Sequence, residues 1–421
     1  MRKSKTLLHV LFLVVVLLLG TSSMMFSSIG LGATAMPDHI TLTWAGDPKT
    51  TQTITWRTSA ITVNGQVQYA EAINTPIFPQ HAITITAGIA SLNTNVGDMG
   101  IHSVTLTGLK PGTRYIYRVG GPDGWSQPYH FTTAPPTVRP FKFLVFGDSQ
   151  SINYGVWRTT ARQARQANPD AVFFTNVGDL VDVGQDYAQW NSWFTAAQDL
   201  VGTIPAMPVT GNHEGFTPEH RFTKPVLFTS QFKLPQNGPE GLKGQVYSFD
   251  YTNAHFIMLD SQESEQGKFV PAMLEKQKKW LEKDLQATNK KWKIVFVHRP
   301  LYNNKPGEVD VNIRKTFGPV FDKYHVDVVF TGHDHAYART YPIYNGDRVS
   351  SPDHGTVYVA AGRSGTKTYR NIIAKDWHEF FHNPADEPNY ITAEVNGNLF
   401  KVKAYKQSGA LIDTWEIRKG Y

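Results

Sequence analysis

Two histidines separated by one residue stand in the segment FTGHDHAYART, directly after an apolar run that is typical of a buried strand. They are His333 and His335. Side chains that follow a strand lie at the open edge of a sheet, where α/β proteins bind ligands, and imidazole is a common metal ligand. The pattern therefore indicates metal binding, in which the two imidazoles either share one cation or hold one each.

Four further β-like runs lead into residues that can bind a metal. Along the chain these residues are Asp148, Asp179, Asn212 followed by His213, and His298. If the strands share one sheet, five strand ends meet at one edge and present carboxylate, amide and imidazole groups. A glycine stands directly before the metal-binding residue in four of the five segments, and we expect each glycine to let the backbone turn sharply.

This mixture of groups indicates hydrolysis assisted by two cations. Two-metal sites hold cations about 3.5 to 4 Å apart and clamp the attacking and leaving oxygens of an in-line displacement. One carboxylate must bridge the cations, and Asp179 is our candidate. Carboxylate, amide oxygen and imidazole together favour Fe, Mn or Zn over Mg or Ca alone.

Positioning these residues requires a layered α/β domain. From residue 141 onward, apolar β runs alternate with helical periodicity, and we expect helices near 156–166, 187–200, 271–287 and 311–324. This alternation predicts sheets buried between helices. The runs GTVYVAAG, YITAEV, NLFKVKAYK and ALIDTWEIR are expected to add antiparallel strands that close the same domain.

The preceding part of the chain has a different pattern. Between residues 39 and 133, seven short alternating runs rich in β-branched residues predict an antiparallel β-sandwich. The segment LKPGTRYIY, residues 109–117, resembles the tyrosine-corner region of fibronectin type III domains. Prolines in 134–140 end the strand pattern, so we expect a sandwich over 36–134 and an α/β domain over 141–421.

The start of the chain predicts export. Residues 1–35 contain three basic residues, an apolar run and an A-x-A pattern, which indicate either a cleaved signal peptide or a retained membrane anchor. The chain has no cysteine, which favours an extracytoplasmic bacterial protein. Three of the six net positive charges lie in this leader. No basic arm for nucleic acid remains, and a small anionic ester is the expected partner.

The motifs GD, GD, GNHE, VxxH and GHxH occur in this order, and in them the sequence resembles the calcineurin-like metallophosphoesterases over nearly all of the chain after the leader. The sandwich and GHDHAYART make it most similar to the purple acid phosphatase branch. The resemblance implies a four-layer αββα catalytic domain with two metal ions. It implies that Asp148, Asp179 and His335 hold metal one, and that Asp179, Asn212, His298 and His333 hold metal two. It also implies that Asn212 and His213 face the substrate phosphate and that His213 assists the leaving oxygen.

Two positions depart from the family pattern. Purple enzymes carry a tyrosine ligand three residues after the bridging aspartate, where this chain has Asp182, so we expect no purple colour. Other members use D-x-H in the first motif, where this chain has Gln150. The missing ligand of metal one is then supplied by Gln150, by a water or by Asp182. Metal one is expected to be weaker and more exchangeable than metal two.

The sequence therefore predicts a secreted phosphoesterase, with phosphomonoesters favoured, that acts through attack of a hydroxide formed at two cations. We expect Glu214, beside His213, to orient neighbouring groups. Within enzymes, the alternative is a phosphodiesterase or nuclease with the same site. Outside enzymes, the alternative is a secreted binding protein whose altered metal site does no chemistry, which the departures at Gln150 and Asp182 motivate.

Overall fold

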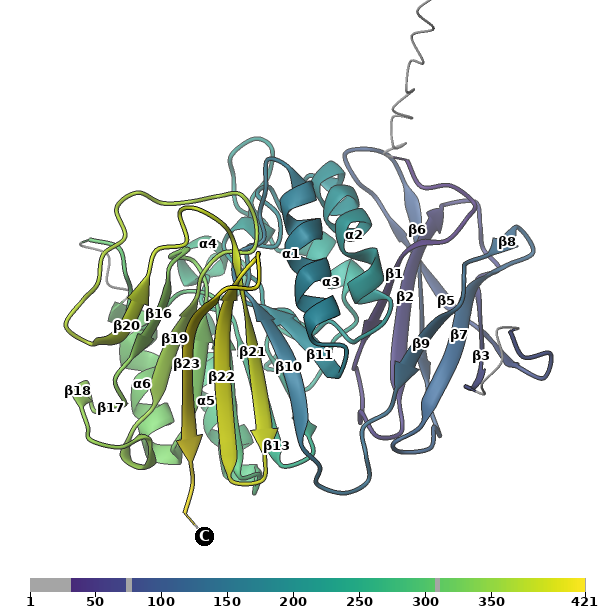
Figure 1. Ribbon diagram of the computed structural model, residues 1–421. Coiled ribbons are helices and arrows are strands. Elements are labelled where there is room, and N and C mark those ends of the chain that lie inside the picture. Colours follow the sequence, from purple (N-terminus) through teal and green to yellow (C-terminus); the bar gives the residue numbers. More distant parts are fainter. Residues whose placement is uncertain (1–31, 73–77, 307–310, 421) are drawn as a thin grey trace, which may run out of the picture. The chain divides into compact units, whose positions relative to one another are not determined.

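The computed structural model describes residues 32–72, 78–306 and 311–420 (Figure 1). Almost all of the expected leader lies outside the described residues. In the described part, no helix is both long enough and apolar enough to cross a membrane.

Two antiparallel sheets form the N-terminal part, at the right of Figure 1. The first sheet has the order β1 (Asp38–Thr43), β2 (Gln52–Ser59), β6 (Met99–Leu106), β5 (Gly88–Leu92). The second has the order β4 (Ile83–Thr86), β3 (Gln66–Glu71), β7 (Arg114–Gly121), β8 (Gly124–Trp125), and β9 (Tyr129–Thr132) also pairs with β7. Tyr115 Oη accepts a hydrogen bond of 2.9 Å from the Lys110 backbone N–H, as in a tyrosine corner. The predicted sandwich is confirmed.

Two further main sheets lie in the rest of the described chain, and they face each other. The five-stranded sheet has the order β11 (Ala171–Asn176), β10 (Phe141–Phe146), β21 (Asn389–Asn396), β22 (Leu399–Lys406), β23 (Leu411–Arg418). The seven-stranded sheet has the order β12 (Tyr247–Tyr251), β13 (Ala254–Leu259), β14 (Trp292–Val297), β15 (Val328–Thr331), β19 (Val357–Ala361), β16 (Tyr337–Thr340), β20 (His378–His382). Phe143 of one sheet contacts Phe256 of the other, with ring centroids 5.3 Å apart. An apolar core therefore fills the space between the sheets.

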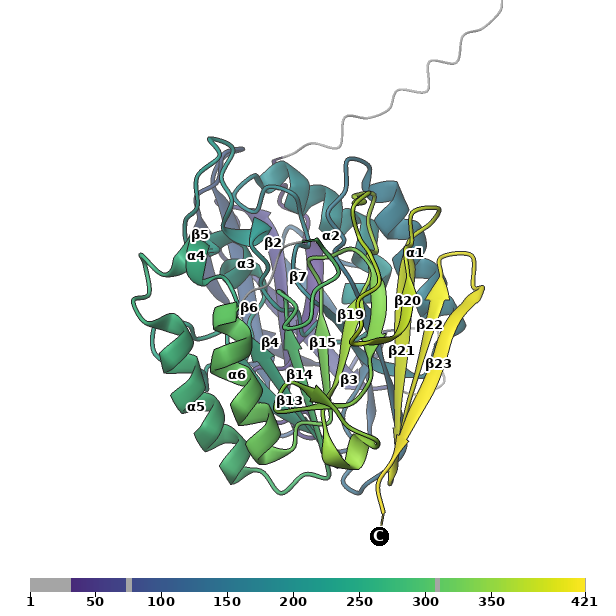
Figure 2. The same ribbon diagram turned by 90° about the vertical axis from the view of Figure 1, so that its left-hand side faces the viewer.

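Helices cover the outer faces of the two sheets. The four main helices are α1 (Tyr154–Ala167), α2 (Tyr187–Val201), α5 (Met273–Ala287) and α6 (Val311–Tyr324). The helices α1 and α2 lie beside the five-stranded sheet, while α5 and α6 lie over the seven-stranded sheet (Figure 2). Trp157 of α1 packs against Phe146 of β10 at a centroid distance of 5.1 Å. The predicted αββα layering and all four predicted helices are confirmed.

Short elements complete the described chain. They are α3 (Val226–Gln231), α4 (Glu263–Gln266), two 3-10 turns (His213–Gly215 and Pro352–His354) and the hairpin of β17 (Ile343–Tyr344) and β18 (Asp347–Arg348).

The structure corrects part of the expected pairing of one strand in the C-terminal part. The run VYVAA forms β19, which pairs parallel with β15 and antiparallel with β16. All five of its residues are buried, and a strand that is covered on both faces is typical of parallel pairing. The prediction of antiparallel pairing for this run is therefore confirmed for its β16 neighbour and wrong for its β15 neighbour, and the carboxyl end of β19 lies at the same edge as that of β15.

The structure also corrects the assumption that the five strand ends share one sheet. The strands before Asp148 and Asp179 belong to the five-stranded sheet, whereas those before His298 and His333 belong to the seven-stranded sheet. The residues before Asn212 form no strand and only an isolated bridge between Ala206 and Phe174. The strand ends come together because the two sheets face each other.

Candidate metal centre

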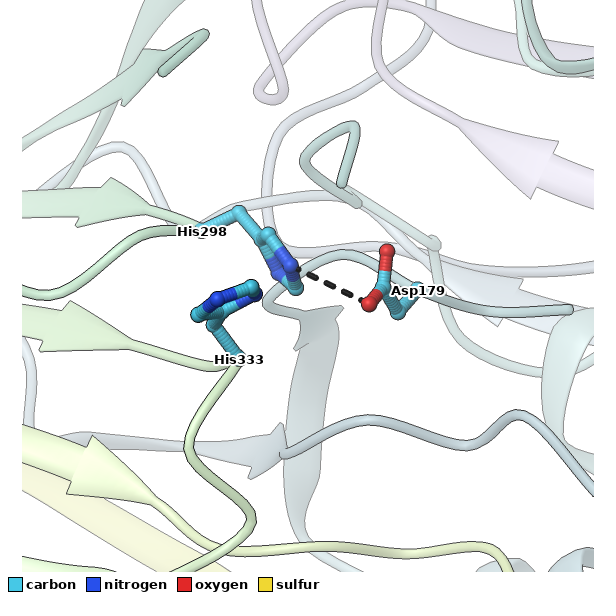
Figure 3. Close-up of side chains that lie close together, drawn as sticks. All are labelled: Asp179, His298 and His333. Atoms are coloured by element: carbon cyan, nitrogen blue, oxygen red, sulfur yellow. Dashed lines mark ion pairs between the residues drawn. The ribbon is translucent and has the colours of Figure 1, made fainter. Parts of the chain in front are cut away.

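Three side chains from both sheets meet where the strands end. Among the described residues, one set of three metal-binding side chains has its ligand atoms within 4.8 Å of one another, and it consists of Asp179, His298 and His333 (Figure 3). Asp179 follows β11, His298 follows β14 and His333 follows β15. His298 Nε2 lies 3.2 Å from Asp179 Oδ2.

The side-chain oxygen of Asn212 lies among these groups. Asn212 Oδ1 is 3.2 Å from His298 Nε2 and 3.2 Å from His333 Nδ1. One amide oxygen thus approaches both imidazoles. Asp179, Asn212, His298 and His333 therefore form one compact set of oxygen and nitrogen atoms.

Asp148 and His335 form an adjoining pair. His335 Nε2 lies 3.0 Å from Asp148 Oδ2, and both side chains are buried. The backbone N–H of His333 donates to Asp148 Oδ1 at 2.9 Å, which links this pair to the set around Asp179. The six residues expected as core ligands consequently lie along one connected rim.

Backbone carbonyls orient two of the imidazoles. His298 Nδ1–H donates to the Val177 carbonyl at 2.8 Å, and His335 Nδ1–H donates to the Lys367 carbonyl at 2.8 Å. Each bond leaves Nε2 directed at a carboxylate. Such anchoring of the remote nitrogen is the usual support of a metal-binding histidine.

Backbone strain lies on three of the candidate metal ligands themselves. Asp179, His333 and His335 have φ of 51°, 68° and 55°, a left-handed conformation that is costly for residues other than glycine. Two of the preceding glycines serve a different purpose from the sharp turn that we expected. A Cβ on Gly211 would lie 2.2 Å from Asp179 Oδ1, and one on Gly332 would lie 2.6 Å from Asp148 Oδ1. These glycines leave room for the carboxylates.

Glu214 holds the loop that carries Asp179. Its buried carboxylate accepts hydrogen bonds from the backbone N–H groups of Asp179 at 2.9 Å, Leu180 at 2.8 Å and Gly211 at 2.6 Å. The side chain thereby ties the segment after β11 to the segment before Asn212. This contact agrees with the orienting role expected for Glu214.

His213 lies beside the set around Asp179. Its backbone N–H donates to Asp179 Oδ1 at 2.9 Å, and its Nε2 lies 3.9 Å from Asp179 Oδ2. Its Nδ1–H donates to the backbone carbonyl of Asp182. The nitrogen Nε2 is therefore the one that faces the centre, and Lys367 Nζ approaches it to 3.2 Å.

Gln150 and Asp182 contact each other. Gln150 Nε2 donates to Asp182 Oδ1 at 3.2 Å, and Lys367 Nζ donates to the same oxygen at 3.0 Å. Asp182 is about half exposed. Gln150 is buried, and its Oε1 has no hydrogen-bond partner within the described residues. Of the alternatives for metal one, Gln150 thus offers an unused oxygen, whereas Asp182 already binds Gln150 and Lys367.

The charges of the cluster depend on one another. Burial by itself raises the pKa of Asp179, but the neighbouring His298 and His213 hold this pKa well below its usual value. Burial by itself lowers the pKa of His298, and the Asp179 carboxylate raises that pKa to about 9. Burial and the charge of His298 push the pKa of His333 well below its usual value. Positive charge between His298 and Asp179 thus balances a buried carboxylate, as a bound cation would.

The groups present fit metal ions. Nitrogen and oxygen ligands that lie about 2.0 to 2.2 Å from one metal lie roughly 3 Å from each other. The separations of 3.0 Å for Asp148 and His335 and 3.2 Å for Asp179 and His298 have this size. The unpaired buried oxygen of Gln150 is a second sign of fit, because buried polar atoms rarely lack a partner.

Sequence reasoning missed Lys367 and Tyr369. Lys367 contacts His213 and Asp182, and its carbonyl anchors His335. The Tyr369 ring lies 4.4 Å from the His335 ring, centroid to centroid. Both residues follow β19, so an assignment of that run as a parallel strand would have marked them as a further strand end.

Two arginines near the motifs, Arg339 and Arg363, make contacts within the framework of the domain. Arg339 pairs with Glu379 and with Asp413, and the buried Arg363 donates to the carbonyls of Pro384 and Gly365.

Comparison with known proteins places this geometry in context. The family model described as the purple acid phosphatase N-terminal domain matches residues 37–133, and that of the calcineurin-like phosphoesterases matches residues 141–337. Acid phosphatase type 7 of Mus musculus is 31% identical over 417 residues, which cover 91% of this chain and 91% of the relative. Purple acid phosphatase 21 of Arabidopsis thaliana is 30% identical and aligned over 79% of this chain and 72% of the relative. The solved structure of a purple acid phosphatase from yellow lupin (Lupinus luteus) seeds shares the fold, with a TM-score of 0.75, 21% identity and coverage of 92% of this chain and 75% of that one.

Proposed function

The chain belongs to the purple acid phosphatase family of calcineurin-like phosphoesterases, hydrolases of phosphate esters, and from this premise we propose that it is a secreted phosphomonoesterase with a dinuclear metal centre. The observation that carries the proposal is the meeting of Asp179, Asn212, His298 and His333 around one point, with Asp148 and His335 adjoining.

The proposed ligand sets follow the two parts of the rim. Asp148, Asp179 and His335 would hold metal one together with the amide oxygen of Gln150, which has no other partner in the described structure. Asp179, Asn212, His298 and His333 would hold metal two. When bound, two such cations supply Lewis-acid charge to a phosphoryl group and make water a nucleophile near neutral pH. The ligand types suit Fe, Mn or Zn, and without a tyrosine at position 182 the protein should lack purple colour.

His213 would manage the proton of the leaving group. Hydrolysis forms a bond between a water oxygen and phosphorus, breaks the bond between phosphorus and the ester oxygen, and ends with one proton on the released alcohol. His213 Nδ1–H is bound by the Asp182 carbonyl, so Nε2 is the atom that can carry this proton. A positioned histidine of this kind contributes about 10² to 10⁴ in rate.

Two observations support monoesters over diesters. The curated relatives of Mus musculus and Arabidopsis thaliana are named as acid phosphatases. In addition, Lys367 places an ammonium group 3.2 Å from His213 Nε2, and such charge favours the more anionic monoester. Residues 1–35 support export, because they combine basic residues, an apolar run and an A-x-A pattern.

Metal content and turnover measured on one preparation test this proposal. We expect about two metal ions per chain by elemental analysis and faster hydrolysis of an aryl phosphate than of a bis-aryl phosphate. Preference for the bis-aryl ester would contradict the monoester assignment. A chain that binds no metal after reconstitution and hydrolyses neither ester would contradict the dinuclear centre.

A further inference from the structure

A pocket of about 500 Å³ lies beside the candidate metal centre. Its walls come from the loop after β10, the segment after β11 with the start of α2, and the loop after β19. Its volume lies within the range of roughly 300 to 1,000 Å³ that is usual for small-molecule sites. The described chain therefore has room for an organic group next to the phosphoryl site.

The pocket adjoins the centre through two lining residues that contact His213. Lys367 and Asp182 both line the pocket, and both contact His213, one at Nε2 and the other at Nδ1. Gln150 also lines the pocket, and its backbone N–H donates to the Asp179 carbonyl at 3.0 Å. A substrate with its phosphoryl group at the centre and its ester oxygen near His213 would extend into this pocket.

The pocket has both apolar and polar walls. Ile152, Tyr154 and Ala188 contribute apolar surface, which makes up the larger part of the lining, and the other lining residues bring polar side chains. Asp182 Oδ2 has no hydrogen-bond partner among the described residues, although Oδ1 of the same group has two. The Lys367 ammonium has three N–H donors, of which two contact Asp182 and His213. An acceptor and a donor thus stand side by side with unused capacity.

We propose that this pocket binds the alcohol part of the substrate and that this alcohol is polyhydroxylated, as in a sugar or polyol phosphate. The inference rests on the proposed function, because it takes the centre as the phosphoryl site. Neighbouring hydroxyl groups donate to a carboxylate and accept from an ammonium, which matches Asp182 and Lys367. Tyr154 is the one aromatic side chain among the lining residues, and its Oη contacts Gln189 Oε1 at 3.5 Å. The lining residues thus offer one ring and no second ring between which a nucleobase could stack.

Filling the pocket tests the proposal. Ala188→Trp places a large side chain there, and Ala167→Trp, at the exposed end of α1, is the matched control. We expect Ala188→Trp to lower kcat/KM for a hexose 6-phosphate at least about tenfold more than for phenyl phosphate, mainly through KM. The control should leave the ratio of the two values unchanged. Equal effects of Ala188→Trp on both esters would overturn the pocket.

A binding measurement separates this inference from the proposed function. Calorimetry with the full chain and a non-hydrolysable hexose 6-phosphonate needs no turnover. If Ala188→Trp raises the Kd about tenfold, the result supports the pocket, whether or not the protein hydrolyses any ester. Absence of hydrolysis would contradict only the proposed function. An unchanged Kd for Ala188→Trp in a protein that hydrolyses the esters would contradict only the pocket proposal. If Ala188→Trp does not fold, Ser192→Phe, one helical turn further along the same wall, replaces it in both measurements.

Discussion

The two halves of the rim, one around Asp179 and one around Asp148, differ in how many side chains meet in them. Around Asp179, three further side chains bring their ligand atoms to the same point, and each partner is buried or partly buried. Around Asp148, His335 is the one side chain among the described residues that makes a hydrogen-bond contact, while Gln150 and Lys367 both donate to the neighbouring Asp182. Gln150 and Asp182 instead form part of the wall of the neighbouring pocket. One edge of the fold thus combines a compact set of polar groups with a more open one.

The largest effect is expected where the two halves meet, at Asp179. Asp179→Asn keeps the shape of the side chain but removes the negative charge that both proposed cations share. We expect loss of bound metal and a decrease in kcat/KM of about a thousandfold or more. Elemental analysis and an aryl phosphate assay measure the two quantities.

Asp123→Asn, in the exposed turn between β7 and β8, is the matched control and should change neither quantity. An Asp179→Asn protein that keeps both metals and its turnover would refute the bridging role.

His213 lies between the half around Asp179 and the pocket. Its removal should therefore lower the hydrolysis rate without changing the metal content. We expect His213→Ala to retain the metal content and to lose about a hundredfold in kcat for an alkyl phosphate. The loss should be smaller for an aryl phosphate, whose leaving group needs less protonation. His81→Ala, on the exposed surface of the sandwich, is the control. An equal loss for both esters would argue against proton transfer by His213.

A substitution at Gln150 can give the half around Asp148 an additional imidazole ligand. Gln150→His restores the D-x-H pattern, and an imidazole should hold metal one more tightly than an amide oxygen does. We expect the chelator concentration that removes the first metal to rise about tenfold, with the second metal unaffected. Gln163→His, exposed on α1, is the control. If both metals leave together in the parent protein, the proposed difference between the halves is wrong.

The smallest effect is expected at Lys367, because this side chain is about one-third exposed. Lys367→Met keeps the length of the side chain and removes the charge beside His213 and Asp182. We expect kcat/KM for phosphomonoesters to fall about fivefold, the size of a partly screened charge interaction. Lys279→Met, exposed on α5, should have no effect. If Lys367→Met keeps the same preference for monoesters over diesters, Lys367 has no role in substrate recognition.

Periodicity and turn residues were sufficient to predict most of the individual elements. The four main helices and seven of the nine sandwich strands lie near where the sequence predicts them, whereas β5 and β8 were not predicted. Amphipathic spacing and β-branched alternation are local properties. The order of the short motifs likewise identified the family and named the side chains that the strands deliver to the rim. Which of these side chains bind metal stays a prediction for the experiments above.

Pairing direction and the choice of partners were decided only by the tertiary structure. The run VYVAA is equally apolar in a parallel or an antiparallel strand, and only its place between β15 and β16 sets its direction. Lys367 meets Asp182 across 185 positions of sequence, and the pocket between them needs three separate segments. Local sequence cannot predict such contacts, because they form only when the two sheets have packed face to face.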